Sequence, residues 1–277
     1  MNDVLATLVE PFQYGFLQRA FAVTLVASIV CALLSCWLVL VGWSLMGDAV
    51  SHAVLPGVVL SYLVGVPFAV GALVFGIGSV ALIGTVRDTS KLKEDTAIGV
   101  VFTSLFALGL VLVSVTPSQV DLSHILFGNV LGVAPADLAQ VAVLGAIVVV
   151  VLLAKRRDLT LYAFDPAHAH AIGLSPRRLG ALLLGLLAVT VVVALQAVGV
   201  ILVVAMLIIP GATAYLLSDR IDRMLVVAPL VAAGCAVVGF AASYALDASP
   251  AGMVVLAQGV VFTCVHLGTW LTRRRLS

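Results

Sequence analysis

Long, uninterrupted apolar segments divide this chain, and they constrain its fold more than any other feature. A helix needs about 20 mainly apolar residues to cross the hydrocarbon core of a bilayer. Segments close to this length occur at 20–43, 47–64, 66–86, 96–115, 137–154, 179–196, 198–217, 225–246 and 251–271. Their side chains do not alternate between polar and apolar, which disfavours a transmembrane barrel. The sequence therefore predicts an all-α, polytopic bundle of about eight or nine membrane-spanning helices.

The composition excludes two other classes of protein. Hydrophobic residues make up 63% of the chain and charged residues only 10%, against about 25% charged residues in ordinary soluble domains. A soluble domain must cover itself with polar groups, and a disordered chain is poor in apolar residues, so neither class fits. The net charge of +1 without a basic stripe also argues against a nucleic-acid partner. We expect residues 1–277 to form one transmembrane domain in a lipid bilayer, with 1–18 as an interfacial helix.

The basic residues predict which segments face the cytoplasm, because cytoplasmic loops of membrane proteins are enriched in Lys and Arg. The turns near 65, 118, 197 and 248 carry no basic residue. The basic residues gather in four other places: Arg87, Lys91 and Lys93; Lys155, Arg156, Arg157, Arg177 and Arg178; Arg220 and Arg223; and Arg273, Arg274 and Arg275. These four segments, including the C-terminus, are therefore predicted to be cytoplasmic. Nine crossing segments are favoured, with 117–136 outside; a re-entrant 44–64 would instead give eight.

A single acidic side chain, Asp48, lies within the apolar region between Arg19 and Arg87, and His52 follows it by four residues. A carboxylate at the centre of a bilayer costs about 2.5–3.5 kcal/mol, so it is retained where it has a use. Residues i and i+4 share a face of a helix. A carboxylate oxygen and an imidazole nitrogen together suit a divalent metal such as Mn, Fe or Zn. Asp48 and His52 are therefore candidate metal ligands.

Two other interpretations of the pair remain open at this point. Asp48 follows Gly47 at the start of an apolar segment, so it can serve as a helix N-cap while His52 bonds to the backbone. The pair can also relay protons. Pro56 and Gly57 come soon afterwards and predict an interrupted helix, a feature that often marks the substrate site of a transporter.

Asp121 and His124 are weaker candidates, in the segment predicted to lie outside the membrane. They are expected, with less support, to line the path of the ion. The chain contains no Gly-Lys dipeptide and hence no P-loop for ATP hydrolysis. We therefore expect no enzymatic activity and no permanently bound cofactor in this chain, and ATP-driven work would need another subunit.

The loop 155–178 is predicted to contain a short cytoplasmic helix. Asp165 followed by Pro166 is a typical helix start, with Asp as the N-cap and Pro in the first turn. Gly173 provides a stop signal, and Ser175-Pro176 opens the next span. Small alanines such as Ala169 would allow a partner to approach this helix closely.

The pattern of Asp165, Ala169 and Gly173 resembles the coupling helix of ATP-binding-cassette importer permeases. Four further stretches resemble the divalent-metal (manganese, zinc and iron) permeases of that superfamily: 44–63, 91–112, 120–133 and 197–217. The resemblance runs from about residue 15 to 270. It implies a type II importer-like fold in a bacterial inner membrane, with Asp48 and His52 at the metal and the 165–173 helix coupling to the ATPase.

The resemblance also implies partners: a cytosolic ATPase subunit that binds ATP, an extracytoplasmic solute-binding protein that delivers the metal, and a second permease copy. Ser51, Ser123 and the stretch 93–96 look more like the manganese/iron branch than the zinc branch. A zinc permease of the same family and a stand-alone secondary carrier of metal or protons are the alternatives. Gly211 replaces an alanine of the family motif, and we expect this change to loosen the packing there.

Overall fold

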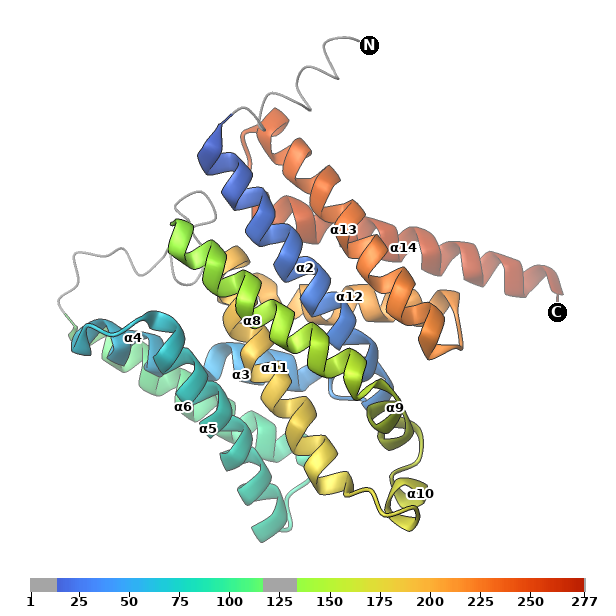
Figure 1. Ribbon diagram of the computed structural model, residues 1–277, viewed down its shortest axis with the longest axis horizontal. Coiled ribbons are helices and arrows are strands. Elements are labelled where there is room, and N and C mark those ends of the chain that lie inside the picture. Colours follow the sequence, from blue (N-terminus) through green and yellow to red (C-terminus); the bar gives the residue numbers. More distant parts are fainter. Residues whose placement is uncertain (1–13, 117–133, 277) are drawn as a thin grey trace.

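The computed structural model describes residues 14–116 and 134–276, and all of the regular structure in these ranges is α-helical. Figure 1 shows the bundle. The helices are α2 (Gly15–Val41), α3 (Ser44–Ala53), α4 (Leu55–Val64), α5 (Phe68–Thr89), α6 (Glu94–Val115), α8 (Pro135–Ala154), α9 (Arg156–Phe164), α10 (Pro166–Ala171), α11 (Pro176–Val198), α12 (Val200–Leu217), α13 (Ile221–Leu246) and α14 (Pro250–Leu276). Most of the interfacial helix predicted at 1–18 lies outside the described residues, and 15–18 belong to α2.

Eight of the described segments are long and apolar enough to cross a bilayer, and residues 202–217 form a shorter apolar helix. This confirms the prediction of a bundle with about eight or nine spans. One of the eight segments, Ser44–Val64, consists of α3 and α4. These helices meet at Val54, just before Pro56, so the predicted interruption is present.

Helix α2 forms the centre of the bundle and packs against α8, α11, α12 and α13. Fifteen of its residues are buried, including the fully buried Trp37. Helices α3 to α6 form a second group, in which α6 packs against both α3 and α4. This arrangement places the short helix α3 between α6 on one side and α11 and α12 on the other.

The expectation that Gly211 loosens the packing is wrong. A Cβ atom at Gly211 would lie 2.6 Å from the carbonyl oxygen of Ser35, a distance that real contacts do not allow. The Gly211 N–H also donates a 3.0 Å hydrogen bond to Ser35 Oγ. Pro210 lacks an N–H and interrupts the hydrogen bonding of α12, and the Ser35 hydroxyl of α2 supplies a hydrogen bond at this interruption. Glycine at position 211 makes the close approach of α2 and α12 possible.

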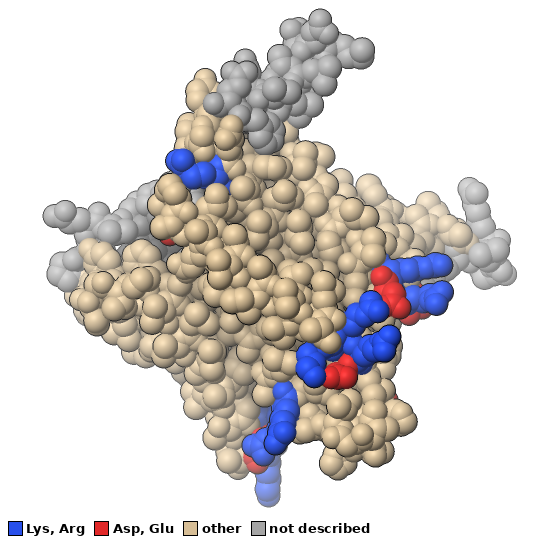
Figure 2. Space-filling model, viewed as in Figure 1, with Lys and Arg blue, Asp and Glu red and all other residues tan. Residues whose placement is uncertain are grey.

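Most basic residues gather where α5, α9, α11 and α13 begin or end, and we call this the basic end of the bundle. It is defined by Arg87, Lys155, Arg156, Arg157, Arg177, Arg178, Arg220 and Arg223. Figure 2 shows most of the charged side chains along one edge, with a smaller basic group on the opposite side, whereas most of the visible face carries none. The charge distribution is that of a bundle with an apolar belt and one rim that is rich in basic residues.

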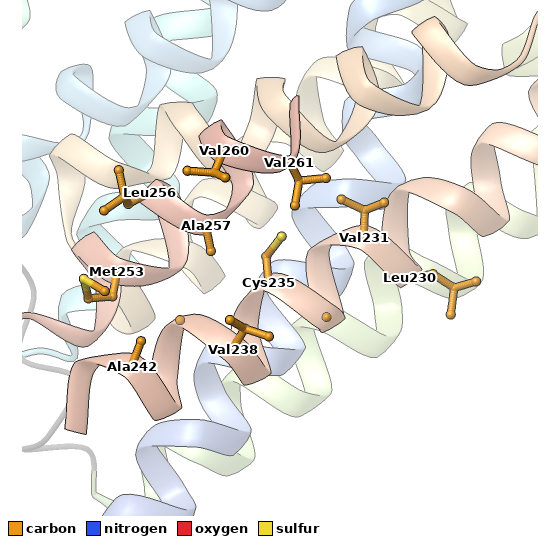
Figure 3. Close-up of a pocket in the computed structure, with 12 residues that line it drawn as sticks. Leu230, Val231, Cys235, Val238, Ala242, Met253, Leu256, Ala257, Val260 and Val261 are labelled. Atoms are coloured by element: carbon orange, nitrogen blue, oxygen red, sulfur yellow. The ribbon is translucent and has the colours of Figure 1, made fainter. Parts of the chain in front are cut away.

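A groove of about 500 Å³ lies between α13 and α14 (Figure 3). Apolar side chains such as Leu230, Val238, Leu256 and Val260 form its walls, and no side-chain oxygen or nitrogen lines it. Oxygen and nitrogen are the ligands of divalent metals such as Mn. The lining of this groove therefore offers no side-chain ligand for such an ion.

Candidate metal site and coupling helix

Asp48 and His52 lie one turn apart within α3. The helix begins at Ser44 with Trp43 as its N-cap residue, so Asp48 is inside the helix and is not its N-cap. The interpretation of Asp48 as a helix cap is therefore wrong. His52 does contact the backbone, because its Nδ1 lies 3.0 Å from the carbonyl oxygen of Asp48.

The two side chains point at one another. His52 Nδ1 lies 3.2 Å from Asp48 Oδ1, and both groups are partly accessible, at 20% and 38% of their side-chain surface. Two neighbouring ligands of one ion, each about 2.1 Å from it at right angles, are about 3 Å apart. The spacing of these two atoms therefore fits a hydrogen bond as well as a shared divalent ion, which would take the place of the Nδ1 proton.

Neighbouring groups fix the orientation of this pair. Ser51 Oγ donates a 2.8 Å hydrogen bond to the Asp48 carbonyl oxygen and lies 3.3 Å from His52 Nδ1. From α6, the rings of Phe102 and Phe106 stand 5.7 and 5.1 Å from the imidazole, each in an edge-to-face arrangement. The imidazole is thus held between its own helix and two aromatic rings, an arrangement that restricts its rotation.

Asp48 and His52 supply two ligands, fewer than a divalent ion needs. Within 14–116 and 134–276, no group of three or more His, Cys, Asp or Glu side chains could hold a metal. Asp121 and His124 lie outside the described residues, so their predicted place along the path stays a prediction. The remaining ligands of an ion held here would come from water, from the backbone, from residues beyond the described part or from another subunit.

The helix predicted in the 155–178 loop is α10. Asp165 is its N-cap, with Oδ1 accepting a 2.9 Å hydrogen bond from the N–H of His168. Gly173 has φ of +88°, a conformation that favours glycine, and ends the helical region. Ala169 is fully buried, so it packs α10 onto the bundle and is not on the surface as expected. Ile172, 57% exposed, is available to a partner.

One helix of this region, α9, is not predicted by the sequence analysis. It is short and contains the polar stretch Arg156–Asp158, but Leu159 is fully buried. Leu159, Tyr162 and Ala163 are spaced three to four residues apart, which is the signal that could have identified it. Helix α9 packs against α2, α8, α10 and α11. This part of the basic end is therefore helical and packed onto the bundle.

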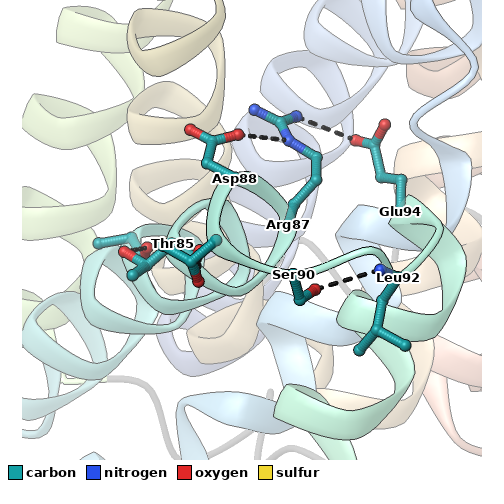
Figure 4. Close-up of polar contacts among 8 residues, drawn as sticks. Thr85, Arg87, Asp88, Ser90, Leu92 and Glu94 are labelled. Carbon is teal, nitrogen blue, oxygen red and sulfur yellow. Dashed lines mark hydrogen bonds and ion pairs between the residues drawn. The ribbon is translucent and has the colours of Figure 1, made fainter.

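One ion pair within α5 and one between α5 and α6 lie at the basic end (Figure 4). Arg87 Nε lies 3.2 Å from Asp88 Oδ1, and Arg87 Nη1 lies 3.6 Å from Glu94 Oε1. Tyr162 of α9 lies close enough to be influenced by these charges. Burial raises the pKa of Tyr162 above its usual value, while Arg87 lowers it and Glu94 raises it further.

The substitution Asp165→Ala should destabilise α10, the helix to which the family resemblance assigns the contact with an ATPase subunit. It removes the acceptor for the His168 N–H, and loss of an N-cap costs about 1 kcal/mol. Co-purification with the ATPase subunit that the family resemblance implies measures the effect, and we expect several-fold less ATPase with the alanine variant. Asp165→Asn keeps a good N-cap and should bind normally. If Asp165→Asn and Asp165→Ala bind equally little ATPase, the charge of the carboxylate is important for binding and the helix cap is not.

Comparison with known proteins agrees with this architecture. The family model described as the ABC 3 transport family matches residues 13–268. The manganese transport system membrane protein MntB of Synechocystis is 51% identical, over 94% of this chain and 85% of that protein. A probable iron transport system membrane protein of Haemophilus influenzae is also 51% identical, over 92% of this chain and 94% of that protein.

A solved structure resembles the whole chain. PsaBC from Streptococcus pneumoniae, in complex with a Fab, superimposes with a TM-score of 0.87 at 38% identity, over 94% of this chain and 95% of that chain. The sequence motifs, the helical bundle and these matches agree with one another. The protein is therefore a multi-pass membrane protein that belongs to the ABC 3 transport family.

Proposed function

We propose that this chain is the permease subunit of an ATP-driven importer for Mn²⁺ or Fe²⁺. The observation that carries the proposal is the Asp48–His52 pair, whose Nδ1 and Oδ1 atoms lie 3.2 Å apart on α3. An oxygen and a nitrogen ligand without a thiolate suit Mn or Fe better than Cu(I). The names of the relatives, which are manganese and iron transport systems, support the choice of metal.

The limited number of ligands suits transport. An ion that must leave again has to be held weakly enough for release. Asp48 and His52 supply a carboxylate and an imidazole, and a second permease copy related by two-fold symmetry would supply the same pair. Ser51 helps to hold the pair in place, because its Oγ donates a hydrogen bond to the Asp48 carbonyl oxygen and lies close to His52 Nδ1. The ion is thus the substrate, held briefly by α3 of one or both copies.

The energy for transport comes from outside this chain, which has no Gly-Lys dipeptide and no P-loop. We propose that a cytosolic ATPase subunit docks at α10 and at the neighbouring exposed side chains of Phe164 and Ile172, which are 61% and 57% exposed. The basic end would then be cytoplasmic, as the positive-inside rule predicts, and so would the C-terminus. A solute-binding protein would deliver the metal at the opposite end, in a bacterial inner membrane.

Uptake of radioactive manganese into proteoliposomes tests this proposal. The vesicles contain the permease with its ATPase subunit and enclose ATP, and the binding protein is added outside. We expect uptake that needs both ATP and the ATPase, and that excess Fe²⁺ inhibits more strongly than Zn²⁺. Uptake that persists without ATP would favour a secondary carrier instead. Transport of zinc but not manganese would favour the zinc branch of the family.

Phe106→Ala should raise the manganese concentration needed for half-maximal uptake by about 3–10-fold. The aromatic ring contributes about 0.5–1.5 kcal/mol through its edge-to-face contact with the imidazole, and its loss lets His52 rotate. The maximal rate should change less than the half-saturating concentration. Phe106→Tyr keeps the ring and should behave nearly as the wild type. An unchanged concentration dependence in Phe106→Ala would contradict a positioning role.

A further inference from the structure

We propose that the contact between Trp43 and Tyr162 couples the ATPase-docking helices to the metal-binding helix. The inference rests on the proposed function, since it assumes that α10 receives the ATPase and that α3 holds the ion. Trp43 and Tyr162 would act as positioning residues, because neither touches the ion. Their contact joins the two parts of the molecule that an ATP-driven importer must connect.

The start of the metal-binding helix α3 contacts α9. Trp43 is the N-cap residue of α3, and Asp48 and His52 follow on the same short helix. The Trp43 ring stands 6.3 Å from the Tyr162 ring of α9, inclined at 60°. A displacement of α9 therefore acts directly on the first turn of α3. Helix α3 ends at Ala53, and only Val54 separates it from α4.

The ATPase-docking helix α10 is joined directly to α9. Asp165 is both the C-cap residue of α9 and the N-cap residue of α10, so the two helices follow one another without a linker. Helix α9 is also joined to the central helix, because Trp37 Nε1 donates a 3.3 Å hydrogen bond to Thr160 Oγ1. A force on α10 would thus reach Tyr162, one turn of helix before Asp165.

A glycine makes the aromatic contact possible. A Cβ atom at Gly180 of α11 would lie 2.9 Å from Tyr162 Oη and 3.5 Å from the Trp43 ring. Helix α11 therefore lies against both rings, and an alanine at position 180 would have to displace the Tyr162 hydroxyl. With α11 beside them, the two rings are expected to stay in contact when α9 moves, so that the motion of α9 reaches α3.

The ratio of manganese transported to ATP hydrolysed, in proteoliposomes with the whole transporter, tests the proposal. Trp43→Leu and Tyr162→Leu should lower this ratio at least about 10-fold while ATP hydrolysis continues. Tyr162→Phe keeps the ring and should preserve the ratio. A matched control is Phe21→Leu, which removes an aromatic pair between α2 and α13 with rings 5.4 Å apart; it should leave the ratio unchanged.

A second pair of variants keeps the test decisive if the leucine variants fail to fold. Gly180→Ala should lower the ratio several-fold by displacing Tyr162, and Gly180→Ala combined with Tyr162→Phe should restore it, because the clashing hydroxyl is gone. An unchanged ratio in Gly180→Ala, no rescue by Tyr162→Phe, or an equal loss in Phe21→Leu would overturn the proposal. Absence of manganese uptake by the wild type would instead contradict the proposed function.

Discussion

Asp48→Asn is expected to lower manganese uptake by about 100-fold or more, while the permease still inserts and assembles with its ATPase. Asparagine has nearly the same size but no charge, and a neutral amide is a much poorer ligand for a divalent cation than a carboxylate. Even partners that only orient a metal ligand contribute about 10–100-fold to affinity. Radioactive uptake, normalised to the amount of permease in the membrane, measures the effect.

The same substitution at another carboxylate provides the control. Asp247 is exposed and follows α13 with φ of +50°, a left-handed conformation that asparagine adopts readily. Asp247→Asn should therefore change uptake by less than about 2-fold. Retained uptake in Asp48→Asn would remove Asp48 from the list of metal ligands. An equal loss in both variants would point to a general effect of charge on the transporter.

Gly71→Ala should destabilise the protein by about 3 kcal/mol or more. A Cβ atom at Gly71 would overlap the carbonyl oxygen of Gly57, and one at Gly57 would overlap the carbonyl oxygen of Gly71, so α4 and α5 cross with their backbones in contact. Small residues of this kind allow close helix packing in membranes. Overpacking costs about 1–3 kcal/mol where side chains can yield, and backbone atoms yield less.

Thermal unfolding of the purified permease in detergent measures this prediction. We expect an apparent melting temperature lower by about 6–12 °C, from the usual shift per kcal/mol for a chain of this size. The control is Gly78→Ala on the same helix, where an added Cβ would meet nothing within 4 Å; it should be neutral or slightly stabilising. Equal melting temperatures for the two variants would contradict the close crossing of α4 and α5.

The sequence predicted those features that depend on neighbouring residues. Spans follow from apolar length, and the ends of α10 follow from Asp165, Pro166 and Gly173 as cap signals. The spacing of Asp48 and His52 correctly predicted that they share one face of a helix. These features need no knowledge of tertiary contacts, because helical geometry alone brings residues i and i+4 together.

Contacts between distant segments could not be predicted in this way. Phe102 and Phe106 meet His52 only because α6 packs against α3. Gly211 looked like a packing defect because its neighbour Ser35 lies on another helix. The alternative of Asp48 as an N-cap stayed open until α3 was found to begin four residues earlier, at Ser44. Helix starts are difficult to locate where no Ser, Thr, Asp or Asn stands at the N-cap position.

The central claim, that the transported ion is held by Asp48 and His52, is tested most directly by locating the ion. We would collect anomalous diffraction at the manganese absorption edge from crystals of the transporter loaded with Mn²⁺. The claim predicts an anomalous peak within about 2.0–2.3 Å of an Asp48 carboxylate oxygen and a His52 ring nitrogen, absent from the Asp48→Asn variant. A manganese peak elsewhere in the membrane region, with none at this pair, would contradict it.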